Sequence, residues 1–302
     1  MPAQPIMNMR GLSYALAATV LWSGNFIVAR MLTQDVPPIT VSFLRWLAAC
    51  LFLVPLCGPA FVRSWPLIRQ HWKFFFLASI TGSSLFSCLI YLAAVTSSAL
   101  NMSLIATSSP VFTLVLARIF LKEALFPLKV LGILLALCGV ILLITRGDLQ
   151  VLLHLRIQTG DLFCLCSAAC FALYTIQLRS QPISMPPMLF IATISFMALL
   201  TLVPFTIVEL WRYEAPLRFT WPMAASFIYM GLGASVAAFL CWIRAVGEVG
   251  AGNAMLLYYT LPFFSGMEAV IFLNESVHWV HWASGALILG GILVATRVRG
   301  AN

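Results

Sequence analysis

The chain has 302 residues, of which 62% are apolar and only 9% are charged, and its mean hydropathy is +1.01. This composition excludes a water-soluble globule, which is about half apolar and a quarter charged, so lipid is the expected solvent for most of the surface. The formal charge of +8 comes from Lys and Arg scattered singly at the ends of apolar runs. That distribution is typical of membrane topology signals and argues against a nucleic-acid partner.

Ten apolar runs follow one another with short polar gaps, and most are long enough to cross a hydrocarbon core as helices. In chain order the expected spans are 11–31, 40–57, 73–95, 99–120, 128–145, 160–179, 187–209, 222–246, 252–273 and 281–296. The first run follows Arg10 and could imitate a signal peptide, but its length and the many spans after it predict a retained helix.

The second half of the chain repeats the first at a shift of about 150 residues, which indicates duplication. At a shift of 149 the matches are Gly11 with Gly160, Arg30 with Arg179 and Pro37 with Pro186; at 152 they are Asn101 with Asn253, Pro110 with Pro262 and Glu123 with Glu275. Each half holds five spans, and this odd number predicts that the second half is inverted, as in many secondary transporters. The expected fold class is therefore all-α, a polytopic membrane protein with ten transmembrane helices in two inverted five-helix repeats. The expected units are residues 10–147 and 158–299.

Lys and Arg are more frequent in the gaps that share a side with the N-terminus, clearly in the first half and weakly in the second. This bias predicts that both termini are cytoplasmic in a multi-pass protein of the inner (plasma) membrane. The expected partners are the lipid bilayer and a small-molecule substrate, and we expect a monomer or a weak homo-oligomer.

The eight cysteines lie in or at the ends of apolar runs, without His or carboxylates at ligand spacing. They are expected to pack as small apolar side chains, with no metal site. The histidines lie in gaps or at span ends, and the sequence carries no Walker motif, so we expect no cofactor and no enzyme activity. An enzyme acting on lipids is the rival class, and it would need a catalytic cluster near one membrane interface.

Three of the charged residues inside expected spans lie well away from the span ends or carry candidate roles, and inserting a charged residue costs about 2.5–3.5 kcal/mol. Glu268 lies midway along the ninth span; it could bind substrate or a coupling proton, or pair with a neighbouring helix for structure. Arg244 could bind a substrate carboxylate, pair with Glu268, or extend to the headgroups. For Arg45, five residues into the second span, we expect extension to the headgroups or a structural role.

Pro110 and Pro262 break equivalent spans, because proline removes one backbone donor and displaces a carbonyl. In a carrier such breaks can serve as hinges and expose carbonyls to a cavity; the alternative is a static bend. Ser108 and Tyr258, which lie shortly before these prolines, are candidates for the cavity lining.

A further set of aromatic and polar side chains lies at mid-span positions in both halves: Trp22, Asn25, Tyr91, Tyr174, Gln177 and Trp242. Rings with a few polar groups are typical of small-molecule pockets, whereas Trp and Tyr near span ends belong to interfacial belts. Small residues at Gly132–Ala136 and at Ala286–Gly290 predict close packing between the fifth and tenth spans, which would join the halves.

Two sets of short motifs carry a resemblance to a known family. The first set is Ser109-Pro-Val-Phe-Thr, Leu121-Lys-Glu, Leu131-Gly and Leu137-Cys-Gly-Val; the second is Leu261-Pro-Phe-Phe, Asn274-Glu-Ser, Gly285 and Gly290-Gly291. Together with Trp22-Ser-Gly-Asn-Phe and the region of Arg45, they resemble the EamA group of the drug/metabolite transporter superfamily over nearly the whole chain. Lys122 and Asn274 depart from the pattern, because the family usually has Gly before the Glu. Arg244 and Glu268 are charged where many members are apolar.

The resemblance implies a ten-helix carrier that moves metabolites, with amino acids or related compounds as the leading substrates and export as the expected direction. The expected mechanism is alternating access about Pro110 and Pro262, and proton coupling through Glu268 is a further hypothesis. A passive facilitator or channel for small solutes is the alternative.

Overall fold

The computed structural model describes residues 8–97, 102, 105–123, 126–145, 147–148, 150, 158–180, 185–213, 220–273 and 279–296. The elements of the first half are α1 (Met9–Leu32), α2 (Pro38–Arg63), α3 (Trp65–Gln70), α4 (Trp72–Ser79), η1 (Ile80–Ser84), α5 (Leu85–Thr96), α7 (Ser109–Phe120) and α8 (Pro127–Thr145). Those of the second half are α10 (Thr159–Ser180), α11 (Pro187–Arg212), α12 (Trp221–Ile228), η2 (Tyr229–Ala237), α13 (Ala238–Val249), α14 (Ala251–Leu257), η3 (Tyr258–Thr260), α15 (Leu261–Leu273) and α16 (Trp279–Thr296). Every regular element of the described ranges is thus helical, and the all-α prediction is confirmed.

Six helical stretches are long and apolar enough to cross a membrane: Met9–Leu32, Pro38–Arg63, Trp72–Thr96, Thr159–Ser180, Pro187–Arg212 and Trp221–Val249. Three shorter apolar helices, Ser109–Phe120, Pro127–Leu142 and Trp282–Ala295, overlap other expected spans. The start of the expected span 99–120 falls partly outside the described residues, as do Asn101 and Glu275, so the count of ten spans stays a prediction.

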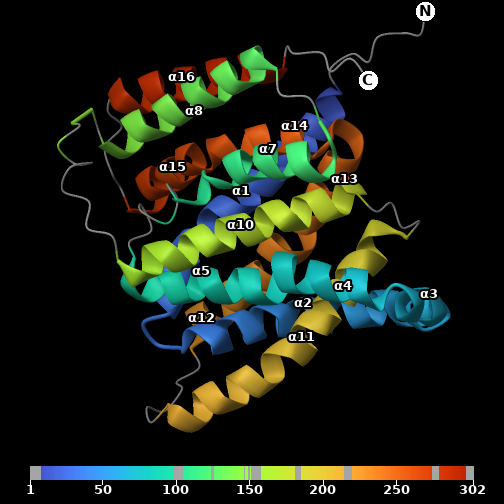
Figure 1. The fold of residues 1–302 in the computed structure, drawn as a ribbon. Helices are drawn as coiled ribbons and strands as arrows, with labels where there is room; N and C mark the ends of the chain where they lie inside the picture. Colours follow the sequence, from blue (N-terminus) through green and yellow to red (C-terminus); the bar gives the residue numbers. More distant parts are fainter. Residues whose placement is uncertain are drawn as a thin grey trace, which may run out of the picture.

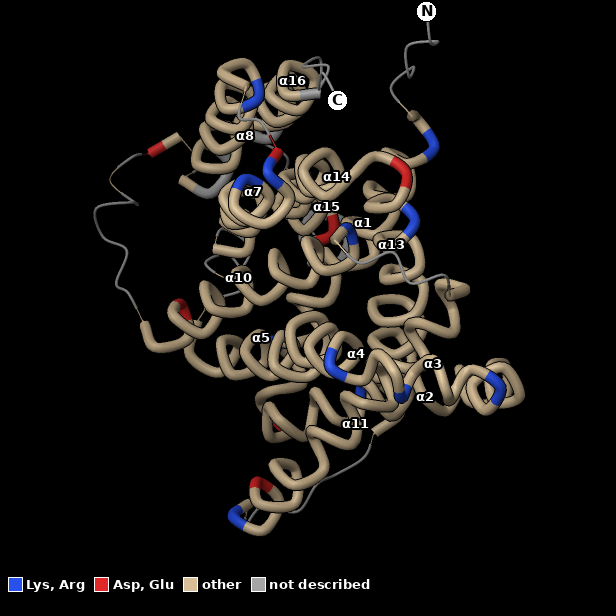
Figure 2. The backbone as a smooth tube through the Cα atoms, turned by 45° about the vertical axis from the view of Figure 1, so that its right-hand side comes forward, with Lys and Arg blue, Asp and Glu red and all other residues tan. Residues whose placement is uncertain are grey.

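The outer surface suits lipid. Large apolar side chains such as Leu51, Val62 and Phe205 are exposed by 68%, 72% and 62%, and Figure 2 shows long helical stretches without Lys, Arg, Asp or Glu. In a membrane these side chains face hydrocarbon, so their exposure costs nothing there, whereas in water it would mark an interaction surface.

Helices that are equivalent in the two halves run antiparallel to each other, as an inverted repeat requires. Figure 1 shows α8 and α16 lying side by side, and Gly132 near the start of α8 faces Ala295 near the end of α16. In the second such pair, Glu209 near the end of α11 accepts hydrogen bonds from the amides of Ile39 and Thr40 at the start of α2, at 3.0 and 2.6 Å. The inverted arrangement follows from these contacts.

The small-residue contact between α8 and α16 is present, but the packing face predicted on α16 is displaced by one residue. A Cβ added at Gly291 would lie 2.5 Å from the carbonyl oxygen of Gly132 and 2.6 Å from the amide nitrogen of Ala136. Gly290 instead has open space around it, and Ala286 is exposed. The face Gly132–Ala136 is confirmed, whereas Ala286–Gly290 is wrong, because the face that packs contains Gly291 and Ala295.

Two π-helical segments interrupt equivalent spans at equivalent places. η1 begins at Ile80 and η2 at Tyr229, which is the repeat shift of 149 residues. The wider turn leaves some carbonyls free for side-chain donors, and such turns are frequent at functional sites. The Ser235 hydroxyl, for example, donates to the carbonyl of Met230, five residues earlier, at 2.8 Å.

Candidate functional site

Four of the predicted cavity residues meet in one cluster of rings between the halves. The Trp22 ring of α1 lies 5.3 Å from that of Trp242 in α13 and 6.1 Å from that of Tyr258 in η3, centroid to centroid. Phe171 of α10 lies 5.1 Å from Trp22 and 6.1 Å from Tyr174. All five side chains are buried. Trp22 and Phe171 are equivalent at the shift of 149 residues, so the cluster lies on the pseudo-twofold axis that relates the halves.

A polar cluster around Arg45 borders these rings. The guanidinium donates from Nη1 to the Tyr91 hydroxyl at 2.9 Å and to Asn25 Oδ1 at 3.4 Å. It also donates from Nε to the Ser235 hydroxyl at 2.6 Å and from Nη2 to the carbonyl of Ala234 at 3.0 Å. Arg45 is only 1% exposed, so the expectation that it extends to the headgroups is wrong. Two predicted residues, Asn25 and Tyr91, thus hold an arginine that was not predicted as part of the site.

Glu268 approaches α1 next to these clusters. Its Oε1 accepts a hydrogen bond of 2.5 Å from the Ser23 hydroxyl, while its Oε2 is buried without a hydrogen-bond partner among the described residues. A Cβ at Gly24 would lie 3.5 Å from this Oε2 and 2.7 Å from the Tyr229 hydroxyl, which itself donates to the carbonyl of Leu21 at 2.7 Å. The glycine therefore leaves room for both side chains against α1.

Two predicted residues lie away from this centre. The Gln177 amide donates to the Thr81 hydroxyl at 3.0 Å, which joins α10 to η1. Arg244 is exposed, and its guanidinium lies 5.6 Å from the centroid of the Tyr14 ring. The structure does not form the Arg244–Glu268 ion pair that was one of the alternatives, because Glu268 bonds to Ser23 instead.

The two prolines lie where their spans are interrupted. Pro110 is in the first turn of α7, after a turn in which the Ser108 hydroxyl donates to the carbonyl of Ile105 at 2.6 Å. Pro262 is in the first turn of α15, directly after the short 3₁₀ segment η3. α7 and α15 begin at equivalent residues, at the shift of 152. The breaks predicted at both prolines are thus present, and their use as hinges stays a prediction.

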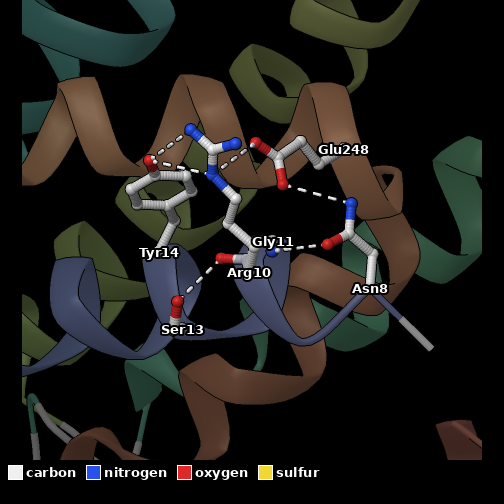
Figure 3. A network of polar contacts seen from close by, with 6 residues as sticks. All are labelled: Asn8, Arg10, Gly11, Ser13, Tyr14 and Glu248. Atoms are coloured by element: carbon white, nitrogen blue, oxygen red, sulfur yellow. Dashed lines mark hydrogen bonds and ion pairs between the residues drawn. The ribbon is translucent and has the colours of Figure 1, made fainter. Parts of the chain in front are cut away.

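One set of polar contacts joins the start of α1 to α13, and we call it the α1–α13 contact (Figure 3). The Asn8 amide donates to Glu248 Oε2 at 3.1 Å, and Arg10 Nε lies 3.9 Å from Glu248 Oε1. A Cβ at Gly11 would lie 2.5 Å from a methyl group of Val249. The start of α1 therefore packs directly on the end of α13.

The equivalent elements of the inverted halves form a second such contact, the α10–α5 contact. The amide of Gly160, the equivalent of Gly11, donates to the Thr96 hydroxyl at 3.0 Å. The Ser97 hydroxyl donates to Asp161 Oδ1 at 2.5 Å. The start of α10 is thus fixed to the end of α5 in the same way as the start of α1 is fixed to the end of α13.

These two contacts lie at opposite ends of α1. Arg30, in the last turn of α1, donates to the carbonyls of Ala94 and Val95 at 2.6 and 3.1 Å, next to the α10–α5 contact. The α1–α13 contact is at the first turn of the same helix. Since α1 is long and apolar enough to cross a membrane, the two contacts lie toward opposite ends of the bundle.

The role of η2 in the site could not be found from hydropathy. The carbonyl of Ala234 in η2 accepts from both Trp22 Nε1, at 2.8 Å, and Arg45. The sequence contains one signal of this role, since Gly82 and Gly231 are equivalent at the shift of 149 residues. A Cβ at Gly82 would lie 2.4 Å from the Tyr174 ring, and one at Gly231 would lie 2.6 Å from the Cβ of Ala48. A repeated glycine in the middle of a span therefore marks close helix approach near the site.

Comparison with known proteins agrees with this architecture. The EamA-like transporter family matches residues 9–145 and again residues 158–297. Similar proteins include an uncharacterized transporter of Archaeoglobus fulgidus, 23% identical over 93% of this chain and 96% of its own. YyaM of Bacillus subtilis, also an uncharacterized transporter, is 26% identical over 94% and 92% of the two chains.

A protein of Streptantibioticus cattleyicolor named "Probable terminal-alkyne amino-acid exporter" is 25% identical over 96% of this chain and 95% of its own. A crystal structure of another protein superposes with a TM-score of 0.71 at 18% identity, over 94% of this chain and 96% of the other, and so shares the fold. The family match covers both halves of the sequence, and the three relatives are named as transporters or as an exporter. The chain therefore belongs to the EamA-like transporter family and is a multi-pass membrane transporter.

Proposed function

We propose that the protein is a secondary carrier that exports small amphipathic metabolites, amino acids or related compounds, by alternating access. The central support is that rings and a few polar groups from both halves converge on the pseudo-twofold axis. Small-molecule sites combine apolar walls with sparse polar groups, and inverted-repeat transporters place them between the repeats. The proposed substrate-binding residues are Trp22, Asn25, Tyr91, Ser108, Tyr174, Gln177, Trp242, Arg244, Tyr258 and Glu268.

The closed state of the centre supports alternating access. Tyr174 and Trp242 are 0% exposed, so a substrate reaches the rings only after one end of the bundle opens. The α1–α13 contact and the α10–α5 contact are equivalent and lie at opposite ends of α1. In the proposed cycle one contact breaks while the other stays closed, and the helix breaks at Pro110 and Pro262 act as the hinges.

The proposed orientation places both termini in the cytoplasm, so that the α1–α13 contact faces the cytoplasm of the cell and the α10–α5 contact faces outward. The bias of Lys and Arg toward the gaps on the N-terminal side supports it. Export is supported by the printed name of the Streptantibioticus relative. Glu268 is the proposed proton-coupling group, because one of its oxygens is buried without a hydrogen-bond partner among the described residues and a proton would satisfy it.

A growth screen tests the proposed substrates. Cells that express the protein are grown with toxic amino-acid analogues, beside cells that carry the empty vector and cells with a Trp242→Ala variant at matched membrane level. We expect resistance to at least one analogue with the wild type alone, because removing the buried indole deletes one wall of the site. Equal growth of all three strains with every amino-acid analogue would show that amino acids are not the substrates.

A further inference from the structure

Among the described residues, the charge on Arg45 has no acidic partner. Its four hydrogen-bond acceptors are a serine hydroxyl, a tyrosine hydroxyl, an amide oxygen and a backbone carbonyl, all of them neutral. Its other close neighbour is the ring of Trp46, whose centroid lies 5.3 Å from the guanidinium carbon. The ion pairs of the described residues are Arg10–Glu248 and Lys129–Glu123. Within the described part of the chain, the positive charge of Arg45 is therefore stabilised by dipoles and one ring.

Three carboxylates of the described residues accept hydrogen bonds from groups other than Arg45. Glu268 accepts from Ser23, Glu209 accepts from the first amides of α2, and Asp161 accepts from Ser97. An arginine cannot relieve its own burial by losing a proton, unlike a lysine or a carboxylic acid. A buried charge without a partner is costly inside a membrane protein, where such residues mark substrate pathways.

The Arg45 guanidinium keeps one N–H donor without an acceptor among the described residues. It carries five N–H donors, and four hydrogen bonds are formed within the described residues. Two of the present acceptors, the hydroxyls of Tyr91 and Ser235, are themselves donors, to Asn25 Oδ1 at 3.2 Å and to the carbonyl of Met230 at 2.8 Å. The fork of an arginine matches the two oxygens of a carboxylate.

The ring cluster adjoins the Arg45 guanidinium. Trp22 Nε1 and Arg45 Nη2 donate to the same atom, the carbonyl oxygen of Ala234, at 2.8 and 3.0 Å. On the basis of the proposed carrier function, we infer that Arg45 binds the carboxylate of the substrate, while the apolar part of the substrate lies against Trp22. The substrate class is then small carboxylates with an apolar side, and an uncharged solute of the same shape is excluded.

Matched acid and amide pairs test this inference. Purified full-length protein in lipid nanodiscs is heated with L-phenylalanine, 3-phenylpropanoate or L-leucine, and with the amides of the same three acids. A ligand that binds the folded state raises the unfolding temperature. We expect the acids to stabilise the wild type and the amides to do so far less. Equal stabilisation by acid and amide, or none by any acid, would overturn the inference.

Two variants separate binding from a structural role of Arg45. In Arg45→Gln we expect at least about 30-fold weaker binding of the acids and no remaining preference over the amides. Arg45→Lys keeps the charge and supports the fold if the glutamine variant is unstable, and it should retain the acid preference at reduced affinity. Arg63→Gln, which removes an exposed arginine from the last turn of the same helix, is the matched control and should behave as the wild type.

The result is separable from the carrier function itself. Folded Arg45→Gln protein that still prefers acids would show that another group binds the carboxylate. Exchange transport of a solute that lacks a carboxylate would support the carrier function and overturn this inference. Absence of exchange with every solute would instead contradict the carrier function.

Discussion

Gly291→Leu is expected to separate the two halves of the protein at the α8–α16 contact. The added Cβ would meet backbone atoms of Gly132 and Ala136 at 2.5 and 2.6 Å, and backbone cannot move aside as a flexible side chain can. Overpacking of this kind costs about 3 kcal/mol, and in lipid close packing is itself the main attraction between helices. We expect a clearly lower unfolding temperature in detergent and loss of the single size-exclusion peak.

The neighbouring glycine provides the control. Gly290 has open space around it, so Gly290→Leu adds the same apolar mass to the same helix without meeting the other half. It should unfold at the temperature of the wild type. Equal destabilisation by both variants would mean that the register of the contact is wrong, and no destabilisation by either would mean that the contact does not hold the halves together.

Glu268→Gln is expected to abolish the accumulation of substrate that an imposed pH gradient drives, while exchange of substrate across the membrane continues. Glutamine keeps the size of the side chain and an acceptor for the Ser23 hydroxyl, but it cannot take up and release a proton. Proteoliposomes with and without a pH gradient measure both activities on the same preparation. The retained exchange shows that the variant is folded.

Glu123→Gln is the matched control for this experiment. Glu123 is a partly exposed carboxylate that lies 4.0 Å from Lys129 at the start of α8, away from the ring cluster. Its variant should keep gradient-driven accumulation. Full gradient-driven transport by Glu268→Gln would remove this residue from the coupling mechanism, whatever the control does.

Hydropathy and the internal repeat predicted much of the fold for a physical reason. In hydrocarbon a backbone must satisfy its own hydrogen bonds, so long apolar runs form helices, and the described spans follow the predicted ones closely. The internal repeat added information on helix breaks that hydropathy does not contain. Because Pro110 and Pro262 recur at equivalent positions, both helix breaks could be predicted together, and α7 and α15 begin beside them.

The sequence was less informative about which side of a span faces protein. Gly290 and Gly291 are adjacent and equally small, and lipid tails are as apolar as a neighbouring helix, so hydropathy cannot choose between the two faces. Arg45 shows the same limit for a charged residue. Its burial depends on acceptors from three other spans, Asn25, Tyr91 and Ser235, and no pattern within its own span reveals them.

The carrier mechanism itself is tested most directly by counterflow. Proteoliposomes that contain the purified protein are loaded with an unlabelled substrate from the growth screen and diluted into a trace of the labelled compound. The proposed mechanism predicts that the label rises transiently above its equilibrium level inside, because each outward passage of unlabelled substrate returns the site to bind label. A steady approach to equilibrium without this overshoot, at the same rate in unloaded vesicles, would identify a passive facilitator and contradict alternating access.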